Sequence, residues 1–228
     1  VSEGGLRSQL AHGIGALGVG YDYASTSTFE TGYNVDGYSN VQYHTPSGLL
    51  PLGAQVKIGY VPNMQATAGN SYKASVSTNT TEAEGRNMQQ AQLSLAPIDG
   101  LTIEGDVAEV GTHFADANGD DGISANLGAK YTMGQFSIGY TEGGYQPATG
   151  ATADDETVYY ENKYYGIQFD VNDALSISYN MDESDQTTRT AVAAGATAGT
   201  SAVIGMEQET LQLAYTMGGA TVGIADIE

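Results

Sequence analysis

The sequence has no cysteine and no tryptophan, and only 7 of its 228 residues are Lys or Arg. The lack of cysteine excludes disulfide frameworks and thiolate metal sites. With 27 Asp and Glu the formal net charge is -20, so the basic surface that neutralises nucleic-acid phosphates is missing. We therefore expect no DNA or RNA partner.

Long hydrophobic runs are missing as well. No segment approaches the roughly 18 consecutive apolar residues that a transmembrane helix needs. The chain is therefore either soluble or crosses a membrane as strands. Val1 does not open a basic region followed by an apolar one, so we expect any secretion signal to have been removed or to lie outside this sequence.

Segments of about ten residues with apolar and polar side chains in alternation are frequent, and this two-residue period is typical of a pleated strand. The clearest example runs from Ile123 to Met133. One face of that strand would carry Ile123, Ala125, Leu127, Ala129, Tyr131 and Met133. The other face would carry Ser124, Asn126, Gly128, Lys130 and Thr132. One face is apolar and the other is polar.

The connections between these segments alternate between short and long. This pattern predicts ten strands over residues 39–45, 53–61, 87–96, 101–111, 122–133, 135–142, 158–170, 174–181, 207–217 and 220–226. Short turns rich in Gly, Asn and Asp fall at 97–100, 134, 171–173 and 218–219, and long connections fall at 63–86, 112–121, 143–157 and 182–206. Short turns on one side and long loops on the other are typical of outer-membrane barrels. The predicted fold class is therefore all-β, a transmembrane antiparallel β-barrel.

Four stretches of the sequence resemble the general porins of alphaproteobacteria. They are residues 43–47, 125–134, 171–179 and 211–225. The resemblance implies a trimeric, 16-stranded barrel in the bacterial outer membrane, in contact with lipid and lipopolysaccharide, through which small hydrophilic solutes and ions diffuse passively. It makes residues 1–228 one porin domain that is incomplete at both ends and holds the sixth to the fifteenth strand.

The same resemblance makes residues 1–37 the long loop that folds into the barrel and narrows the pore. The candidate constriction residues are Glu3, Arg7, Asp22, Glu30 and Asp36, with His12 as a further positive group. An ordinary strand over 12–23 is the alternative.

The alternating pattern also predicts which side chains line the pore wall. The candidates are Lys57, Gln90, Gln92, Glu104, Asp106 and Lys130. Both lysines should point inward, because a charge that faces mid-bilayer lipid costs about 2–4 kcal/mol. Carboxylates facing few cations predict weak cation selectivity. The alternative is that most acids lie on external loops.

Tyrosines gather near the predicted strand ends, which favours aromatic girdles at the two membrane interfaces. The members are Tyr131, Tyr140, Tyr159, Tyr160, Tyr164, Tyr165, Tyr179 and Tyr215.

Asp116, Asn118 and Asp120 resemble the start of a calcium loop. The glycine and the bidentate Glu that an EF-hand requires are missing, because the corresponding positions hold Asp121 and Leu127. We expect no cofactor, and calcium bound at most loosely in a polar external loop.

No nucleophile elbow, phosphate loop or zinc-type His-Glu motif occurs, so the sequence predicts that the chain is not an enzyme. Two other functions stay open. One is a soluble or cell-surface β-rich adhesin or lectin, which would bury the apolar face of its sheets. The other is a substrate-specific outer-membrane channel.

Overall fold

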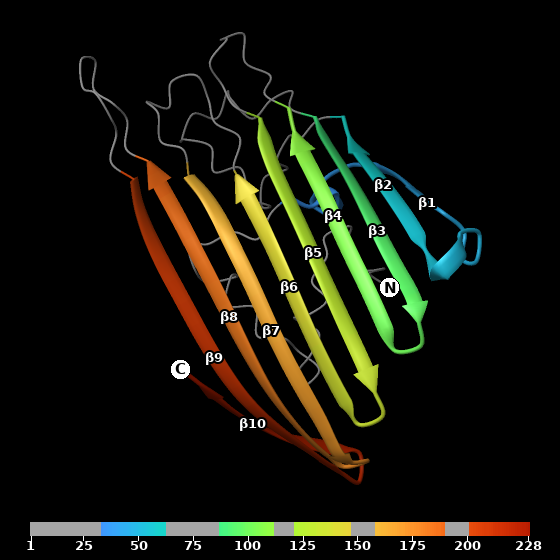
Figure 1. The fold of residues 1–228 in the computed structure, drawn as a ribbon, viewed down its shortest axis with the longest axis vertical. Coiled ribbons are helices and arrows are strands. Elements are labelled where there is room, and N and C mark those ends of the chain that lie inside the picture. The colour runs from blue at the N-terminus through green and yellow to red at the C-terminus, as the bar shows by residue number, and fades with distance from the viewer. Residues whose placement is uncertain (1–32, 63–86, 112–120, 147–157, 190–200) are drawn as a thin grey trace.

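The described residues form one ten-stranded antiparallel sheet whose strands follow each other in chain order (Figure 1). The computed structural model describes residues 33–62, 87–111, 121–146, 158–189 and 201–228. The strands are β1 (Val41–His44), β2 (Gln55–Val61), β3 (Met88–Ile98), β4 (Leu101–Val110), β5 (Gly122–Met133), β6 (Phe136–Gln146), β7 (Val158–Asn172), β8 (Leu175–Arg189), β9 (Ser201–Met217) and β10 (Ala220–Ile227). Two single-turn 3₁₀ helices, η3 (Val35–Gly37) and η4 (Pro51–Gly53), flank β1. The predicted all-β antiparallel fold is confirmed.

The sheet is curved, so it has an inner and an outer face. Strand β10 passes behind β8 and β9, and η3 lies on the same side (Figure 1). We call this concave side the inner face. Within the described ranges, no helix is long and apolar enough to cross a membrane.

Polar side chains are buried on the inner face and apolar side chains are exposed on the outer face. In β5, Ser124 and Asn126 are only 1% and 8% exposed, whereas Ile123 and Leu127 are 48% and 62% exposed. A soluble sandwich would bury the apolar face, because burial of apolar surface stabilises its core. This inversion removes the support for a soluble β-sandwich.

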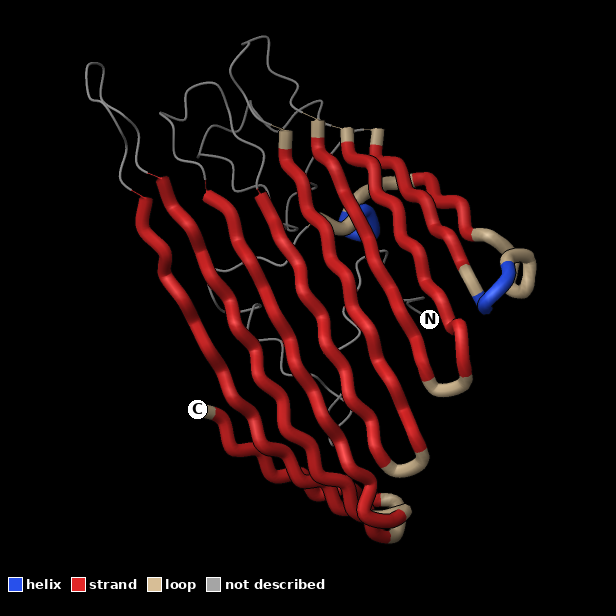
Figure 2. Tube along the Cα trace, in the orientation of Figure 1, coloured by secondary structure: helices blue, strands red, loops and turns tan. Residues whose placement is uncertain are grey.

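A tight turn occurs near each of the four predicted places, at residues 99–100, 134–135, 173–174 and 218–219, and the four turns lie together at one end of the sheet (Figure 2). A glycine with positive φ lies in each of these turns except the turn between β7 and β8. Gly100 shows the reason: its φ is 78°, and a Cβ atom there would lie 2.1 Å from the Thr132 carbonyl oxygen. Only glycine fits this position without strain.

Three strands run at least four residues further than the sequence predicted. The expected loop 182–206 contributes Asp182–Arg189 to β8 and Ser201–Met206 to β9, and β6 continues to Gln146. The pairing between β8 and β9 is unbroken from Glu183↔Glu207 to Arg189↔Ser201. On β8 the outward side chains beyond Glu183 are no longer apolar, and on β9 Ala202, Val203 and Ile204 follow one another. The alternation that marks a strand therefore disappears while the backbone ladder continues.

Smaller differences occur at several other boundaries, for example in β3 and β1. Strand β3 extends through Pro97 to Ile98, with a register irregularity between Leu95 and Ile98 where the sequence predicted a turn. Strand β1 is limited to Val41–His44. A proline at an irregularity does not interrupt the ladder, because no backbone N–H is required there.

Candidate functional site

The inner face is lined by side chains that form hydrogen bonds but mostly carry no charge. Its buried polar residues are Gln90, Gln92, Asp106, Ser124, Asn126, Thr141, Asn162, Ser178, Asn180, Gln208, Thr210 and Gln212. Carboxamides and hydroxyls make up this set except for Asp106. The strand register places them on one face, because residues two apart along a strand point to the same side.

The predicted wall residues all lie on this inner face. Cross-strand pairs join Lys57 to Gln92 and Gln92 to Asp106. Glu104 lies opposite Gly128, and Lys130 lies opposite Thr102. Their common orientation agrees with the predicted direction of their side chains, and their role as a pore wall stays a prediction.

Asp106 is held by two amide donors from the neighbouring strands. Gln90 Nε2 donates to Asp106 Oδ2 at 3.2 Å, and Asn126 Nδ2 donates to Asp106 Oδ1 at 3.2 Å. Asp106 is 6% exposed. A buried carboxylate needs such donors, because burial without them costs several kcal/mol.

The segment before β1 packs against the inner face. Val35 N donates to Gln90 Oε1 at 2.9 Å, and Gln90 Nε2 also lies 3.3 Å from the Tyr33 carbonyl oxygen. Tyr33 N donates to Ser124 Oγ at 3.0 Å. Gln90 therefore binds this segment through both ends of its amide group, as a neighbouring strand would.

Aromatic packing fixes the same segment. The Tyr33 ring meets the Tyr145 ring edge-on with centroids 5.0 Å apart, and Tyr145 stacks on Tyr160 at 5.6 Å. A buried apolar cluster surrounds them, consisting of Tyr33, Val35, Val61, Met88, Ala108, Val110, Tyr145 and Tyr160. The last residues of the predicted constriction segment are thus anchored on the inner face.

Most of the predicted constriction lies outside the described residues. This applies to Glu3, Arg7, His12, Asp22 and Glu30. Asp36 is described; it is exposed, and its Oδ1 accepts a hydrogen bond from Gln42 Nε2 at 2.6 Å.

The weak calcium candidates Asp116, Asn118 and Asp120 also lie outside the described residues. In the part of the chain that is described, no three or more His, Asp or Glu residues are grouped to hold a metal ion.

The outer face has an apolar part near the short turns and an acidic part beyond it. On β8, Ile177, Tyr179 and Met181 are followed by Glu183 on the same face, and on β9 Leu213 and Leu211 are followed by Glu209. We call the outward charged side chains beyond the apolar part the acidic belt. Its members are Glu109, Glu142, Glu161, Glu183, Asp185, Glu207 and Glu209, with Lys163 among them.

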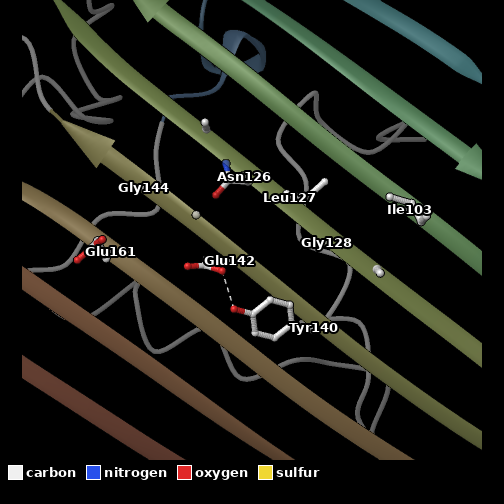
Figure 3. Close-up of a pocket in the computed structure, with 11 residues that line it drawn as sticks. Ile103, Asn126, Leu127, Gly128, Tyr140, Glu142, Gly144 and Glu161 are labelled. Atoms are coloured by element: carbon white, nitrogen blue, oxygen red, sulfur yellow. Dashed lines mark hydrogen bonds between the residues drawn. The ribbon is translucent and has the colours of Figure 1, made fainter.

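Tyrosines lie at the boundary between the two parts. The Tyr140 hydroxyl donates to Glu142 Oε2 at 2.7 Å (Figure 3), and Tyr179 is hydrogen-bonded to Glu209. These hydroxyl groups point away from the short turns and towards the acids. The arrangement is typical of an aromatic girdle, in which the ring meets lipid and the hydroxyl meets water.

Two tyrosines of the predicted girdle are placed differently. Tyr160 and Tyr164 point to the inner face, where they are 8% and 7% exposed. Their neighbours Tyr159 and Tyr165 point outward at 38% each. Adjacent residues of a strand face opposite sides, so a pair of consecutive tyrosines cannot contribute both rings to one girdle.

The acidic belt is the feature that sequence reasoning missed. Of the acids in the described strands, Glu104, Asp106, Asp170 and Asp182 face inward, and most of the others face outward. The signal was present in the sequence: Glu142 follows Tyr140 at a spacing of two, and Glu183 follows Met181 in the same way. The strand period had only to be continued past the apolar residues.

A groove of about 540 Å³ crosses the outer face at this boundary (Figure 3). Ile103, Leu127 and Tyr140 line its apolar part, and Glu142 and Glu161 line its polar part. It faces away from the inner wall, so it is a depression on the membrane side of the sheet.

Comparison with solved structures connects this geometry to outer-membrane proteins. OmpT of Vibrio cholerae, folded in vitro, superposes with a TM-score of 0.55 at 14% identity, over 98% of this chain and 65% of that one. A loop L8 deletion mutant of the same OmpT gives a TM-score of 0.53 at 12% identity, over 83% of this chain and 57% of that one. This chain thus spans less than two thirds of the length of either structure.

No family model and no curated protein matches the sequence. At this level of identity the structural likeness shows the fold alone, which is that of an outer-membrane β-barrel. It supports the predicted location in the bacterial outer membrane. Membership of the alphaproteobacterial porins stays a prediction.

The prediction that the chain is not an enzyme has to be corrected. The likeness to OmpT establishes an outer-membrane barrel, and a barrel is a scaffold that can carry either a pore or a catalytic site. The absence of sequence motifs therefore does not exclude an enzyme.

Proposed function

We propose that the protein is an outer-membrane porin, which forms a water-filled channel for passive diffusion of small hydrophilic solutes and ions. The observation that carries the proposal is the polarity of the two faces: buried amides and hydroxyls inside, exposed aliphatic and aromatic side chains outside. Lipid requires an apolar exterior, and water requires a polar lumen.

Planar-bilayer recordings of the detergent-extracted native protein test the proposal. We expect discrete conductance steps when the protein is added to the bilayer. A protein that gives no conductance at any concentration, while it remains folded in detergent, would contradict the channel.

We further propose weak cation selectivity. Glu104, Asp106, Asp170 and Asp182 face inward against Lys57 and Lys130 in the described strands. A lumen with more carboxylates than cations concentrates cations. The reversal potential in a salt gradient measures the preference, and a value favouring chloride would refute it.

The barrel is proposed to contain further strands beyond the ten. Within the described sheet, β1 and β10 each have one neighbouring strand. A free edge in lipid is costly, because each unpaired backbone group costs several kcal/mol. Sixteen strands and a trimer are the arrangement that the porin resemblance implies, and native mass spectrometry of the detergent complex tests the trimer.

The proposed partners of the outer face are membrane lipid and lipopolysaccharide. The apolar part of that face would contact acyl chains, and the acidic belt would lie at the level of the headgroups. Loosely bound calcium in the external segment around residues 116–120 remains part of the proposal, and calorimetric titration of the protein with calcium measures it.

A further inference from the structure

The groove on the outer face continues as a second depression towards the short turns. The groove has a volume of about 540 Å³ and the depression a volume of about 430 Å³. Ala129 and Tyr140 line both, so the two hollows meet at these residues. Ile138 on β6 and Ile167 on β7 line the part of the depression that is nearer the short turns. We call the two hollows together the outer groove.

Small outward residues make the outer groove hollow. Ala125 and Ala129 point outward from β5, and Gly144 lies opposite Ala125 on β6. Their larger neighbours Leu127 and Tyr140 are 62% and 38% exposed and stand beside them. The surface that lines the hollow is mainly carbon. A hydrocarbon chain that fills it would gain dispersion contacts along its length.

The depth of the outer groove matches one leaflet of a membrane. On β6 the groove extends from Gly144 to Ile138, which is roughly 20 Å along the strand. A strand tilted by about 45° carries this length through a depth of roughly 14 Å. Half of a hydrocarbon core of about 30 Å is about 15 Å. An acyl chain that begins beside Gly144 would therefore stay in the groove almost to the middle of the membrane.

Charged side chains lie at the end of the outer groove that is furthest from the short turns. Glu142 and Glu161 line the groove there (Figure 3). Lys163 on β7 lies opposite Glu142 on β6 and opposite Glu183 on β8. A headgroup that carries only phosphate would be repelled by these carboxylates, because like charges at short range are unfavourable. A headgroup with an ammonium and a phosphate finds a counterpart for each, carboxylates for the ammonium and Lys163 for the phosphate.

We propose that the outer groove binds one acyl chain of an ethanolamine phospholipid, whose ammonium group lies against Glu142 and Glu161 and whose phosphate lies near Lys163. The proposal rests on the proposed contact of the outer face with membrane lipid and adds a lipid class to it. It does not depend on the channel, because the groove lies on the face opposite the inner wall.

Native mass spectrometry of the detergent-extracted protein measures the binding of single lipids. Dipalmitoyl phosphatidylethanolamine is the probe, and dipalmitoyl phosphatidylglycerol has the same acyl chains but no ammonium group. Purified lipid A, which carries phosphates and no free ammonium group, is the third lipid. We expect the first ethanolamine lipid to bind at a concentration about fivefold lower than the glycerol lipid, because its ammonium group adds charge-assisted hydrogen bonds.

Two variants separate the headgroup from the acyl chain. Glu142→Gln/Glu161→Gln removes two charges at constant volume and should abolish the fivefold preference. Glu207→Gln/Asp226→Asn removes two outward charges on β9 and β10, outside the groove, and should keep it.

Ala129→Leu narrows the outer groove where its two parts meet. It should weaken the binding of both phospholipids by about fivefold, since one or two methylene groups lose their contacts. Val222→Leu enlarges an outward side chain on β10, outside the groove, and should leave binding unchanged. An unchanged circular dichroism spectrum shows that each variant is folded.

Failure of the lipid site and failure of the channel give different results. Equal binding of the two phospholipids, or tighter binding of the glycerol lipid or of lipid A, would overturn the ethanolamine lipid as the occupant. A preference that persists in Glu142→Gln/Glu161→Gln, or binding that Ala129→Leu does not weaken, would overturn the outer groove as its site. Planar-bilayer conductance of the same preparation decides the channel separately: conductance without lipid preference leaves the channel intact, and preference without conductance supports the lipid site and overturns the channel.

Discussion

The inner and outer faces of the same strands differ in which side chains they bury and which they expose. Inside, Gln90, Asn126 and Gln212 are almost completely buried, although each carries a carboxamide. Outside, Leu127, Met133 and Ile138 are more than half exposed, although each is apolar. In a water-soluble domain both assignments would be unfavourable, so the comparison agrees with an outer-membrane barrel, whose outer face meets lipid. The proposed channel would place water on the inner side.

The largest expected effect comes from a charge in the apolar part of the outer face. Ile177→Arg should reduce the free energy of unfolding by about 2–4 kcal/mol, because the guanidinium would face the hydrocarbon. Urea titration in lipid vesicles measures this loss. Glu183→Arg, three outward positions further along β8, should change stability by about 0–1 kcal/mol, because that position lies near the interface. Equal losses at both positions would show that the apolar part does not face lipid.

A smaller effect is expected from loss of the inner anchor. Gln90→Leu removes the hydrogen bonds to Val35 and Tyr33 and one donor to Asp106, and should cost about 1–3 kcal/mol. Gln89→Leu, the outward neighbour on the same strand, is the control and should leave stability nearly unchanged. The single-channel current of Gln90→Leu should also become noisier, since the segment before β1 loses its main attachment to the wall.

Removal of one tyrosine hydroxyl tests where the apolar part of the outer face ends and the acidic belt begins. Tyr140→Phe deletes the bond to Glu142 and keeps the ring in place, so it should cost about 0.5–1 kcal/mol. Tyr131→Phe, nearer the short turns and also outward, is the comparison. A loss at Tyr140 that exceeds the loss at Tyr131 in vesicle-based unfolding would support the position of the acidic belt in water.

Substitution of the two acids on opposite faces of β4 should change stability least. Only one of the two substitutions should change the ion selectivity. Glu104 points inward and Glu109 points outward. Glu104→Gln should shift the reversal potential towards chloride, while Glu109→Gln should leave it unchanged, because only the first charge borders the lumen. Equal shifts in both variants would contradict the assignment of the faces.

The sequence predicted the ten strands because apolar and polar residues alternate wherever a strand has lipid on one side and a polar wall on the other. Ile123–Met133 and the short turn at Gly134 are the clearest cases. The same reasoning oriented Lys57 and Lys130 inward, as the register places them. It failed over Asp182–Arg189, where both faces are polar, and over Ser201–Met206, where Ala202, Val203 and Ile204 follow one another, because neither segment alternates between apolar and polar residues.

The predicted site could be placed only in part for a related reason. Wall residues within regular strands follow from the period of two. The partners of Gln90, by contrast, lie 55 and 57 positions away in Val35 and Tyr33, and no local pattern relates residues that far apart. Sequence reasoning could therefore point Gln90 inward and could not identify the segment that it binds.

By itself the sequence determined the class of fold, the end of the sheet at which the tight turns lie, and the face of each strand that is apolar. These features depend on residues two or three positions apart, so the local order of the side chains is enough to predict them. Only the tertiary structure decided which segment packs on Gln90 and that acids form a belt on the outer face. Those features depend on the register between strands and on the curvature of the whole sheet, which no single segment encodes.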